Sequence, residues 1–390
     1  MSNTSSFFKT KKRWSVYKDE LLANYLPLYL SKILATGRDT LFIDGFAGKG
    51  RFDDGTDGSP IIIRDKIEQA HESTKYPNKV IPIFIEYNKN YANCLKQALD
   101  RDWCYVLNKD YKEEALEILS RNKNKNRNIF MYVDPFGIKH LRYNVFAELA
   151  KNTNSVELLL NLNSFGFIRE GCRLLGVEID EDMGTFEESD DDSFVNSIEN
   201  MNAIANGTYW QDIILRKQSG EISAREAEAL FVQEYMHMLN NDFEYVFEFA
   251  VKTGDHKIPK YRMIFATRHI QGALFMCEDM IKCNNEMSLD NRGQQESIFD
   301  YNYSRVSCED DILSLLHQEW LAQPIECKDL CLIINTLDGP KYLHKDIKQA
   351  LLALEKSGKI QIRRKKLLTP TGKVSSSMDF LKSDIYVELL

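Results

Sequence analysis

The sequence predicts an α/β protein whose first and larger part is a parallel, doubly wound sheet. Between residues 39 and 162, short apolar runs of strand length alternate with longer segments that carry apolar residues at helical spacing. The short runs are apolar at nearly every position, which is typical of strands buried between two layers of helices. The chain has 390 residues, more than one typical core accommodates, so we expect a second domain.

The predicted strands and helices follow one another in a regular order. We expect strands at residues 39–44, 79–86, 104–110, 129–134 and 156–162. We expect helices at residues 14–35, 59–72, 88–100, 111–121 and 141–151, with a kink or break at Pro27. Ser59 as N-cap and Pro60 in the first turn mark the start of the second helix. Right-handed crossovers would place the carboxyl ends of all strands along one edge, where such sheets bind ligands.

The segment after the fifth strand has a different character. Residues 165–243 are polar, carry helical patterns and include a dense acidic stretch at 178–192. We expect a helical insertion that acts as a lid or a substrate-side subdomain. Two further strand patterns, joined by a polar Gly-Asp turn, predict a hairpin added to the sheet. With a helix at about 271–283, this completes a domain of residues 39–285, preceded by a helical segment at 1–38.

The C-terminal part is predicted to be a separate domain at residues 309–390, after a linker at 286–308. It contains three helical patterns followed by a basic strand, and this order resembles a winged helix-turn-helix. Winged domains bind proteins as well as nucleic acids, and the sequence leaves both open. The basic run that would lie on the wing and contact nucleic acid consists of Arg363, Arg364, Lys365 and Lys366.

Composition and short motifs argue against several classes of protein. The formal net charge of −8 argues against a protein that coats nucleic acid non-specifically, although a local basic patch is compatible with it. No apolar run is long enough to span a membrane, and the N-terminus lacks the apolar core of a signal peptide. The eight cysteines include no Cys-x-x-Cys pair, and Cys327 and Cys331 lack two further zinc ligands. We therefore expect reduced thiols in a cytoplasmic protein and no metal site. Signatures of serine hydrolases and zinc proteases are absent.

The first predicted strand ends in the loop FIDGFAGKG. Here Asp44, Phe46, Gly48 and Gly50 lie between a strand and a helix. Glycines in such a loop let the backbone turn tightly and approach a ligand without an intervening side chain. A glycine-rich turn that binds nothing is the alternative, and the missing Gly-Lys-Ser/Thr argues against a phosphate-binding P-loop.

This loop resembles the cofactor loop of S-adenosylmethionine-dependent methyltransferases, which have a Rossmann-like sheet. The resemblance implies that S-adenosyl-L-methionine is bound by the loop residues Asp44, Phe46, Gly48 and Gly50. It also implies that Glu86, in FIEYN at the end of the second strand, holds the two ribose hydroxyls. Asp110, in LNKD at the end of the third strand, would reach the adenine. The stretch RFDDGTDGSP lengthens the spacing to Glu86, but the order of the motifs is kept.

The fourth predicted strand ends in YVDPFG. Asp134, Pro135, Phe136 and Gly137 favour a turn in any protein, and that alternative stays open. The motif is similar to that of tRNA guanosine N2 dimethyltransferases, and in part to the Asn/Asp-Pro-Pro-Tyr/Phe motif of amino-group methyltransferases. The resemblance implies that Asp134 accepts a hydrogen bond from an exocyclic amine, that Phe136 stacks on the base and that Pro135 fixes the turn. Lys18 either reaches the cofactor site from the N-terminal helix or is a solvated lysine.

Together with YRMIFATRHIQGALFMCEDM, these motifs resemble the three-Cys-motif partner proteins, a bacterial family named for its association with a separate protein containing three cysteines. The resemblance covers about residues 14–285 and implies a methyltransferase-like fold and a dedicated partner.

We therefore predict a methyltransferase that modifies an exocyclic amino group of a base in RNA or DNA. Two alternatives remain. One is a non-catalytic, methyltransferase-like subunit of a bacterial multi-protein system, such as a defence system. The other is a dinucleotide-dependent oxidoreductase, in which Asp-Pro-Phe-Gly has no obvious part.

Overall fold

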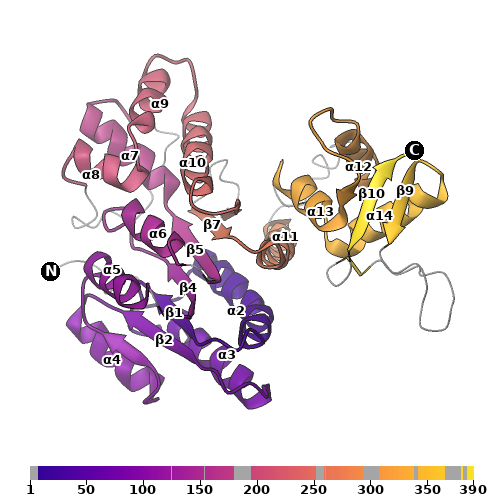
Figure 1. Ribbon diagram of the computed structural model, residues 1–390. Helices are drawn as coiled ribbons and strands as arrows, with labels where there is room; N and C mark the ends of the chain where they lie inside the picture. The colour runs from indigo at the N-terminus through magenta and orange to yellow at the C-terminus, as the bar shows by residue number, and fades with distance from the viewer. Residues whose placement is uncertain are drawn as a thin grey trace. The chain divides into compact units, whose positions relative to one another are not determined.

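The computed structural model describes residues 8–123, 125–152, 154–179, 195–251, 259, 261–292, 307–337, 341–364, 379–380 and 384–390. The chain divides into two compact units, which we call unit 1 (residues 1–269) and unit 2 (residues 270–390) (Figure 1). The sequence predicts that the first domain ends at residue 285. The division falls earlier because helix α11 (Ile270–Arg292) packs against helix α13 (Cys327–Thr336) of unit 2.

Unit 1 is built on one mixed sheet. Its described strands are β1 (Thr40–Asp44), β2 (Val80–Ile85), β3 (Tyr105–Leu107), β4 (Asn128–Val133), β5 (Val156–Leu162), β6 (Tyr245–Val251) and β7 (Tyr261–Thr267). They lie in the order β3-β2-β1-β4-β5-β7-β6. The strands from β1 to β5 are parallel, whereas β7 is antiparallel to both β5 and β6. The predicted parallel sheet with an added hairpin is therefore confirmed, and it is consistent with a Rossmann-like methyltransferase fold.

The strand order changes direction next to β1. The chain proceeds from β1 to β2 and β3 on one side, and then returns to place β4 and β5 on the other side. In open parallel sheets, ligands bind at such a switch point, beyond the carboxyl ends of the strands. The carboxyl ends of β1 and β4 therefore mark the expected position of a functional site.

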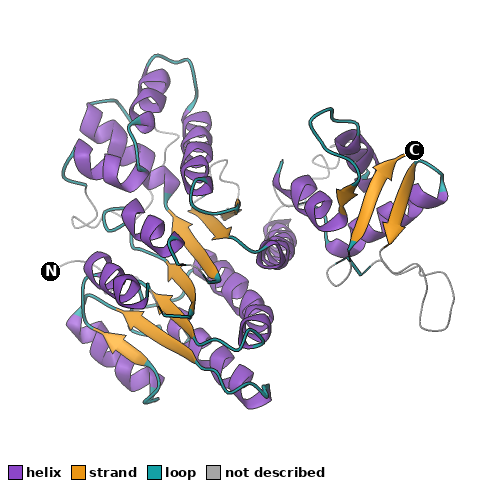
Figure 2. Ribbon diagram, viewed as in Figure 1, coloured by secondary structure: helices purple, strands orange, loops and turns teal. Residues whose placement is uncertain are grey.

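Helices cover both faces of the sheet (Figure 1, Figure 2). The helices that precede or connect the strands are α2 (Arg13–Leu34), α3 (Ser59–Ser73), α4 (Lys89–Leu99), α5 (Tyr111–Asn122) and α6 (Tyr143–Ala150). Alternate residues of a strand point to opposite faces. Phe42 of β1 accordingly stacks on Phe130 of β4, which also contacts Tyr29 of α2, while Ile43 joins the buried cluster that contains residues of α5. Helix α2 continues through Pro27, so the break allowed by the sequence does not occur.

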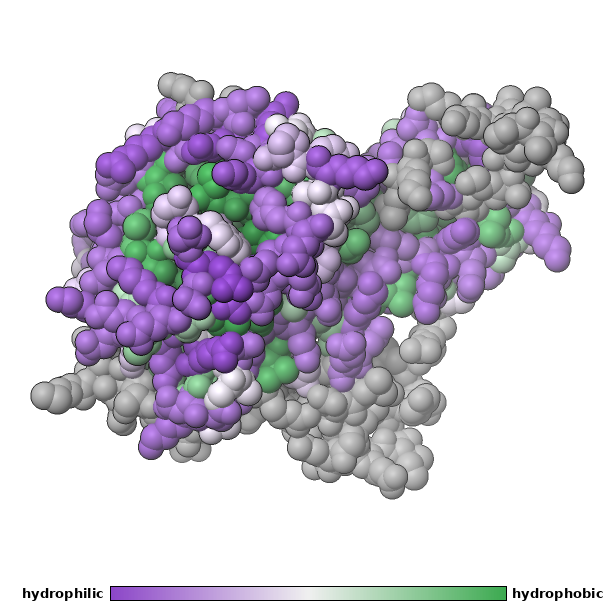
Figure 3. Space-filling model, turned by 90° about the horizontal axis from the view of Figure 1, so that it is seen from below, coloured by the Kyte–Doolittle hydropathy of each residue, from purple (hydrophilic) through white to green (hydrophobic). Residues whose placement is uncertain are grey.

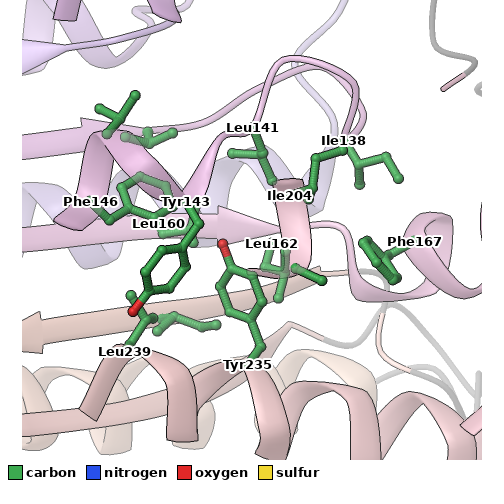
Figure 4. Packing of buried hydrophobic residues seen from close by; sticks show 14 of the residues in the cluster. Ile138, Leu141, Tyr143, Phe146, Leu160, Leu162, Phe167, Ile204, Tyr235 and Leu239 are labelled. Atoms are coloured by element: carbon green, nitrogen blue, oxygen red, sulfur yellow. The ribbon is translucent and has the colours of Figure 1, made fainter. Parts of the chain in front are cut away.

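The predicted helical insertion is confirmed. Its described helices are α7 (Ser164–Leu175), α8 (Ile198–Ala205), α9 (Tyr209–Gln218) and α10 (Ala224–Asn240). Residues 180–194, which hold most of the acidic stretch, lie outside the described residues. Tyr235 of α10 meets Tyr143 of α6 edge to face, and both belong to one buried cluster with Leu160 of β5 (Figure 4). The insertion therefore shares its core with the sheet.

The described part of unit 2 contains α11, α12 (Cys308–Leu316), α13 and α14 (His344–Lys356), with the strands β8 (Ile325–Glu326), β9 (Ile360–Arg364) and β10 (Ile385–Leu389). The strands form an antiparallel sheet in the order β8-β10-β9. The basic strand expected from the sequence is β9. The expected linker at 286–308 begins inside α11, and residues 293–306 lie outside the described residues.

Among the described residues, no helix is both long enough and apolar enough to cross a membrane. The face drawn in Figure 3 is largely hydrophilic, with apolar side chains visible between charged and polar ones. Large apolar side chains such as Trp210, Phe146 and Phe265 are instead fully buried.

Candidate active site

The loop after β1 is organised by the side chain of Asp44, which is fully buried. Its Oδ1 accepts a hydrogen bond from the Phe46 N–H (3.1 Å), and its Oδ2 accepts one from the Ser59 hydroxyl (3.0 Å). Ser59 begins α3, so the carboxyl group of Asp44 joins the loop to the helix that follows it. These bonds give Asp44 a structural role, in which it holds the backbone that a cofactor would contact.

Asp44 is part of a cluster of charged side chains. Burial raises the pKa of Asp44 to about 7, and the negative charges of Asp134 and Asp19 add to the increase. The bonds from Phe46 and Ser59 act in the opposite direction because they stabilise the carboxylate. Charges influence each other in this way only over short distances. The ends of β1 and β4 therefore meet part of α2 in one place, as the strand order predicts.

The glycines of the loop are required by the chain itself. Gly48 and Gly50 have φ angles of 64° and 86°, a region that favours glycine over residues with a side chain. A Cβ atom at Gly50 would also lie 2.9 Å from a side-chain carbon of Leu95. Phe46 packs toward α5, where its ring centroid lies 4.7 Å from that of Tyr111. The loop keeps this conformation for reasons of local geometry, whether or not it also binds a ligand.

Glu86, directly after β2, contacts the glycine loop. Its Oε2 accepts a hydrogen bond from the Gly48 N–H (2.8 Å), and its Oε1 accepts one from the Asn88 N–H (2.6 Å). Burial raises the pKa of Glu86, and the two N–H groups oppose that increase. Each carboxylate oxygen has two lone pairs, so each retains capacity for a further donor such as a ribose hydroxyl. The residues at the ends of β1 and β2 therefore fit the cofactor expected from the sequence.

Asp110 follows β3 and caps α5. Its Oδ1 accepts a hydrogen bond from the Lys112 N–H (2.9 Å), which is a common role of aspartate at the start of a helix. Asn108 joins this strand end to the previous one, because its Nδ2 donates to the main-chain oxygens of Glu86 (2.9 Å) and Tyr87 (2.7 Å). Asp110 is half-buried and lies at the same edge of the sheet as Glu86.

Asp134 comes directly after β4, and its side chain is 22% exposed. Its Oδ1 lies 2.8 Å from Lys18 Nζ and 2.6 Å from Asn161 Nδ2. Its Oδ2 lies 2.8 Å from Lys18 Nζ and 3.3 Å from the hydroxyl of Tyr132. The carboxylate is thus held from α2, β4 and β5 while part of it stays accessible.

The rest of the Asp-Pro-Phe-Gly motif forms a turn. Pro135 is buried, Phe136 is half-buried, and Gly137 has a φ angle of 78°. This geometry agrees with the turn-forming alternative for the motif. A turn by itself does not require the Asp134 side chain to contact two other elements, so the contacts of Asp134 call for a further explanation.

Lys18 was left undecided by sequence analysis. Its side chain is 7% exposed, pairs with Asp134 and lies 4.9 Å from the ring centroid of Tyr261 on β7. The solvated alternative is therefore wrong. A signal was present in the helix pattern, because Lys18 lies three and seven residues before Leu21 and Tyr25, which are both buried. This spacing places Lys18 on the inward face of α2.

Two further residues of the site were missed by sequence reasoning. Asn161 lies on β5, and as a polar residue in the apolar run VELLLNL it needed a buried partner, which was a usable signal. Asp19 follows Lys18 on α2, is buried, and lies 2.6 Å from Lys11 Nζ. Burial raises the pKa of Asp19 to about 6, against the effect of Lys11 and Lys18. No local motif marks Asp19.

The N-terminal segment contacts the loop after β1. The ring of Phe8 lies 5.1 Å from that of Tyr91 on α4 and 5.6 Å from that of Phe52. Its main-chain oxygen accepts a hydrogen bond from the Asp53 N–H (2.7 Å), and Lys11 Nζ donates to the oxygen of Asp57 (2.8 Å). Residues ahead of α2 therefore form part of the wall beside the loop.

The basic run of unit 2 is only partly described. Arg363 pairs with Glu388 on β10 (Nε to Oε1, 2.7 Å), and Arg364 pairs with Glu355 on α14 through two nitrogens (2.9 Å each). Lys365 and Lys366 lie outside the described residues. The two arginines already have acidic partners, which a nucleic-acid phosphate would have to replace.

The eight cysteines are free, and burial raises the pKa of Cys327 to about 12. A buried thiol with a raised pKa, such as that of Cys327, stays protonated and unreactive at neutral pH. In the described ranges of the chain, no group of three or more His, Cys, Asp or Glu side chains could hold a metal ion.

No protein-family model and no curated protein matches the sequence. Several solved structures resemble the fold, and they are methyltransferases. One is the plantazolicin methyltransferase BamL in complex with a triazolic desmethylPZN analog and SAH, with 12% identity, a TM-score of 0.32, and coverage of 68% of this chain and 89% of that chain. Another is a putative sarcosine dimethylglycine methyltransferase from Galdieria sulphuraria, with 14% identity, a TM-score of 0.26, and coverage of 62% and 84%.

A third similar structure is geranyl diphosphate C-methyltransferase from Streptomyces coelicolor A3(2), in complex with Mg2+, geranyl-S-thiolodiphosphate and S-adenosyl-L-homocysteine. It has 11% identity and a TM-score of 0.25, and the match covers 62% of this chain and 75% of that chain. Similarity at this level does not assign an activity, so the function proposed below rests on the geometry of the chain's own residues.

Proposed function

We propose that unit 1 is an S-adenosylmethionine-dependent methyltransferase that modifies an exocyclic amino group of a nucleic-acid base. The observation that carries the proposal is the convergence of the glycine loop, Glu86 and Asp134 at the switch point of the sheet. Glu86 bonds to the loop through Gly48, and Asp134 is near enough to Asp44 to raise its pKa. A cofactor held by Glu86 and the loop would thus lie beside an acid suited to an amine.

The cofactor would be held mainly by the ends of β1 and β2. Glu86 accepts hydrogen bonds from the two ribose hydroxyls with the lone pairs that Gly48 and Asn88 leave unused. Asp110 accepts a bond from the adenine amine while it continues to cap α5. Gly48 and its neighbours let the loop backbone come close to the ligand. When bound, S-adenosyl-L-methionine supplies an electrophilic methyl group.

Asp134 acts on the acceptor. Its carboxylate accepts a hydrogen bond from the amine N–H and so directs the nitrogen lone pair. Transfer of a methyl group places a positive charge on that nitrogen, which the nearby negative carboxylate stabilises. Pro135 holds the turn, and Phe136 offers a ring on which the base stacks.

The remaining parts of the proposal concern unit 2 and the partner. We propose that unit 2 is a winged-helix-like domain that helps to hold nucleic acid or a protein, and the order of its helices and antiparallel strands supports this. Arg363 pairs with Glu388 and Arg364 with Glu355, so the nucleic-acid role requires phosphates to replace these carboxylates. The chain would belong to the three-Cys-motif partner proteins, act in the cytoplasm and associate with a separate three-cysteine protein.

One observation favours a second function, that of a non-catalytic subunit which keeps the fold for interaction. Both oxygens of Asp134 already accept bonds from Lys18, and Oδ1 accepts a further bond from Asn161. A carboxylate held in this way could be a purely structural element of the fold. The two functions differ in a measurable way, because only the first requires a methyl group to be transferred.

The test is methyl transfer from labelled S-adenosyl-L-methionine to unmodified RNA and DNA, with identification of the product nucleoside by mass spectrometry. Asp134→Ala should lower transfer by more than about 100-fold and leave cofactor affinity nearly intact, because the side chain meets the acceptor and not the ribose. Asp134→Asn should retain some activity, since it keeps one acceptor oxygen without the charge. Phe136→Ala should weaken capture of the nucleic acid by about 1–3 kcal/mol.

Asp102→Ala is a matched control, because Asp102 is an exposed aspartate in the segment before β3. It should leave transfer unchanged. Undiminished transfer by Asp134→Ala would exclude this carboxylate from the reaction. If the full chain binds S-adenosyl-L-methionine in calorimetry but transfers nothing to either nucleic acid, the non-catalytic function is favoured. If it does not bind the cofactor at all, the proposal fails.

A further inference from the structure

The two oxygens of Asp134 are held unequally. A carboxylate oxygen offers about two lone pairs to donors. Among the described residues, Oδ1 accepts from Lys18 Nζ (2.8 Å) and Asn161 Nδ2 (2.6 Å), so both of its lone pairs have close partners. Oδ2 accepts from Lys18 Nζ (2.8 Å), and its other neighbour, the hydroxyl of Tyr132, is 3.3 Å away. That distance is long for an O–H···O hydrogen bond. Oδ2 is therefore the oxygen with room for an incoming donor.

Lys18 is well placed to hold the carboxylate in one orientation. It approaches both oxygens at the same distance, so rotation of the carboxylate would break one of its two contacts. The ammonium group is buried, with Asp134 on one side and the ring of Tyr261 at 4.9 Å. A buried cation between an anion and an aromatic face has few alternative positions. Asn161 adds a third contact from β5, on Oδ1 only.

We propose that Lys18 is a positioning residue for Asp134, which together with Asn161 fixes the carboxylate so that Oδ2 accepts the N–H of the acceptor amine. The inference rests on the proposed function, because it assigns Asp134 to an amine. It goes further in naming the atom that faces the acceptor and the two side chains that orient it. Lys18 itself does not touch the reacting atoms. Its effect is on the rate of transfer, through the orientation of Asp134 and not through the cofactor.

The same contacts fit a different role for Lys18, in which its amine occupies the place of the acceptor and blocks the site. The two roles predict opposite results when the amine is removed. A blocking lysine slows the reaction, so its removal accelerates transfer. A positioning lysine accelerates the reaction, so its removal slows transfer.

The experiment compares Lys18→Met, Lys18→Arg and Asn161→Ala in the full chain, with labelled S-adenosyl-L-methionine and the unmodified RNA or DNA that wild type methylates. Lys18→Met keeps much of the length of the side chain without its charge, and should lower kcat by about tenfold to 100-fold with little change in the KM for the cofactor. Lys18→Arg should restore a substantial part of kcat, since a guanidinium group can contact both carboxylate oxygens. Asn161→Ala should lower kcat less, because the lysine contacts remain.

Lys217→Met is the control for removing a buried lysine from a helix. Lys217 lies on α9, is buried, and donates to the main-chain oxygen of Glu178 (3.3 Å). It should leave kcat within about twofold of wild type, because its hydrogen bond goes to Glu178, which is not part of the candidate site. Thermal unfolding identifies any variant that fails to fold. If Lys18→Met is unfolded, the other two variants decide the question. A substantial kcat in Lys18→Arg together with a reduced kcat in Asn161→Ala supports the positioning role, and a loss of kcat in Lys18→Arg with wild-type kcat in Asn161→Ala refutes it.

Four results would overturn the inference. A folded Lys18→Met protein with unchanged kcat removes the positioning role, and one with increased kcat shows that Lys18 blocks the site. In both cases the proposed function stands as long as Asp134→Ala is inactive. The inference also fails if Lys18→Met and Lys18→Arg lose kcat equally while Asn161→Ala keeps wild-type activity. That pattern would mean that the orientation of the Asp134 carboxylate does not set the rate. A wild-type chain that transfers no methyl group refutes the proposed function, and the inference with it.

Discussion

Replacing Asp44 by asparagine should stabilise unit 1 at neutral and alkaline pH. The substitution keeps both contacts of the side chain. The amide oxygen can accept the bond from the Phe46 N–H, and the amide nitrogen can donate to the Ser59 hydroxyl oxygen in place of the bond that Ser59 donates now. What is lost is a negative charge in a fully buried position, beside the negative charges of Asp134 and Asp19. Removing an unpaired buried charge at constant shape favours the folded state.

The magnitude follows from the pKa of Asp44, which burial raises from 3.8 to about 7. Each unit corresponds to about 1.4 kcal/mol, so the raised pKa lowers the free energy of unfolding by on the order of 4 kcal/mol once the group is ionised in both states. Because the folded pKa lies above the unfolded value, this loss begins near pH 4 and is complete above about pH 7. Wild type and Asp44→Asn should therefore agree at about pH 4 and diverge as the pH rises.

Chemical unfolding followed by tryptophan fluorescence measures this difference. Of the four tryptophans, only Trp320 lies in unit 2, so Trp320→Phe in both proteins leaves signals from unit 1 alone. Unfolding curves at several pH values between about 4 and 8 give the two pH dependences. Parallel curves would refute the reasoning, because they would mean that the Asp44 carboxylate is stabilised in the folded protein by groups other than those that contact it here.

Two further predictions concern the cofactor and the C-terminal unit. Glu86→Gln should weaken binding of S-adenosyl-L-methionine by about 1–3 kcal/mol in calorimetry, because an amide cannot accept bonds from Gly48, Asn88 and a ribose diol together; unchanged affinity would exclude Glu86 from the cofactor site. Replacement of residues 363–366 by alanine should weaken binding of nucleic acid at low salt and reduce its salt dependence. Equal binding and equal salt dependence, with loss of a protein partner, would make unit 2 an interaction module.

The sheet could be predicted closely because buried parallel strands leave a local signal. The strand expected at 129–134 is β4 at Asn128–Val133, and every residue of β4 is buried. The third strand was overestimated, since 104–110 was expected and β3 spans only Tyr105–Leu107. It is the edge strand, where Tyr105 is 53% exposed, and the residues after it serve other purposes. Asn108 bonds to the end of β2, and Asp110 begins α5.

By itself, the sequence determined the alternation of strands and helices, the glycine loop, and the presence of Glu86 and Asp134 at strand ends. The strands, helices and turns follow from hydrophobic periodicity and turn chemistry, which act over a few residues. The shared edge of the strand ends follows from the handedness of the connections between parallel strands. Only the tertiary structure decided what Asp134 contacts. Lys18 lies 116 residues away in the chain and Asn161 lies 27 residues away. A lysine at a helical spacing can be solvated or buried, and only the packing of α2 beside β4 and β5 brings its ammonium group into contact with the Asp134 carboxylate.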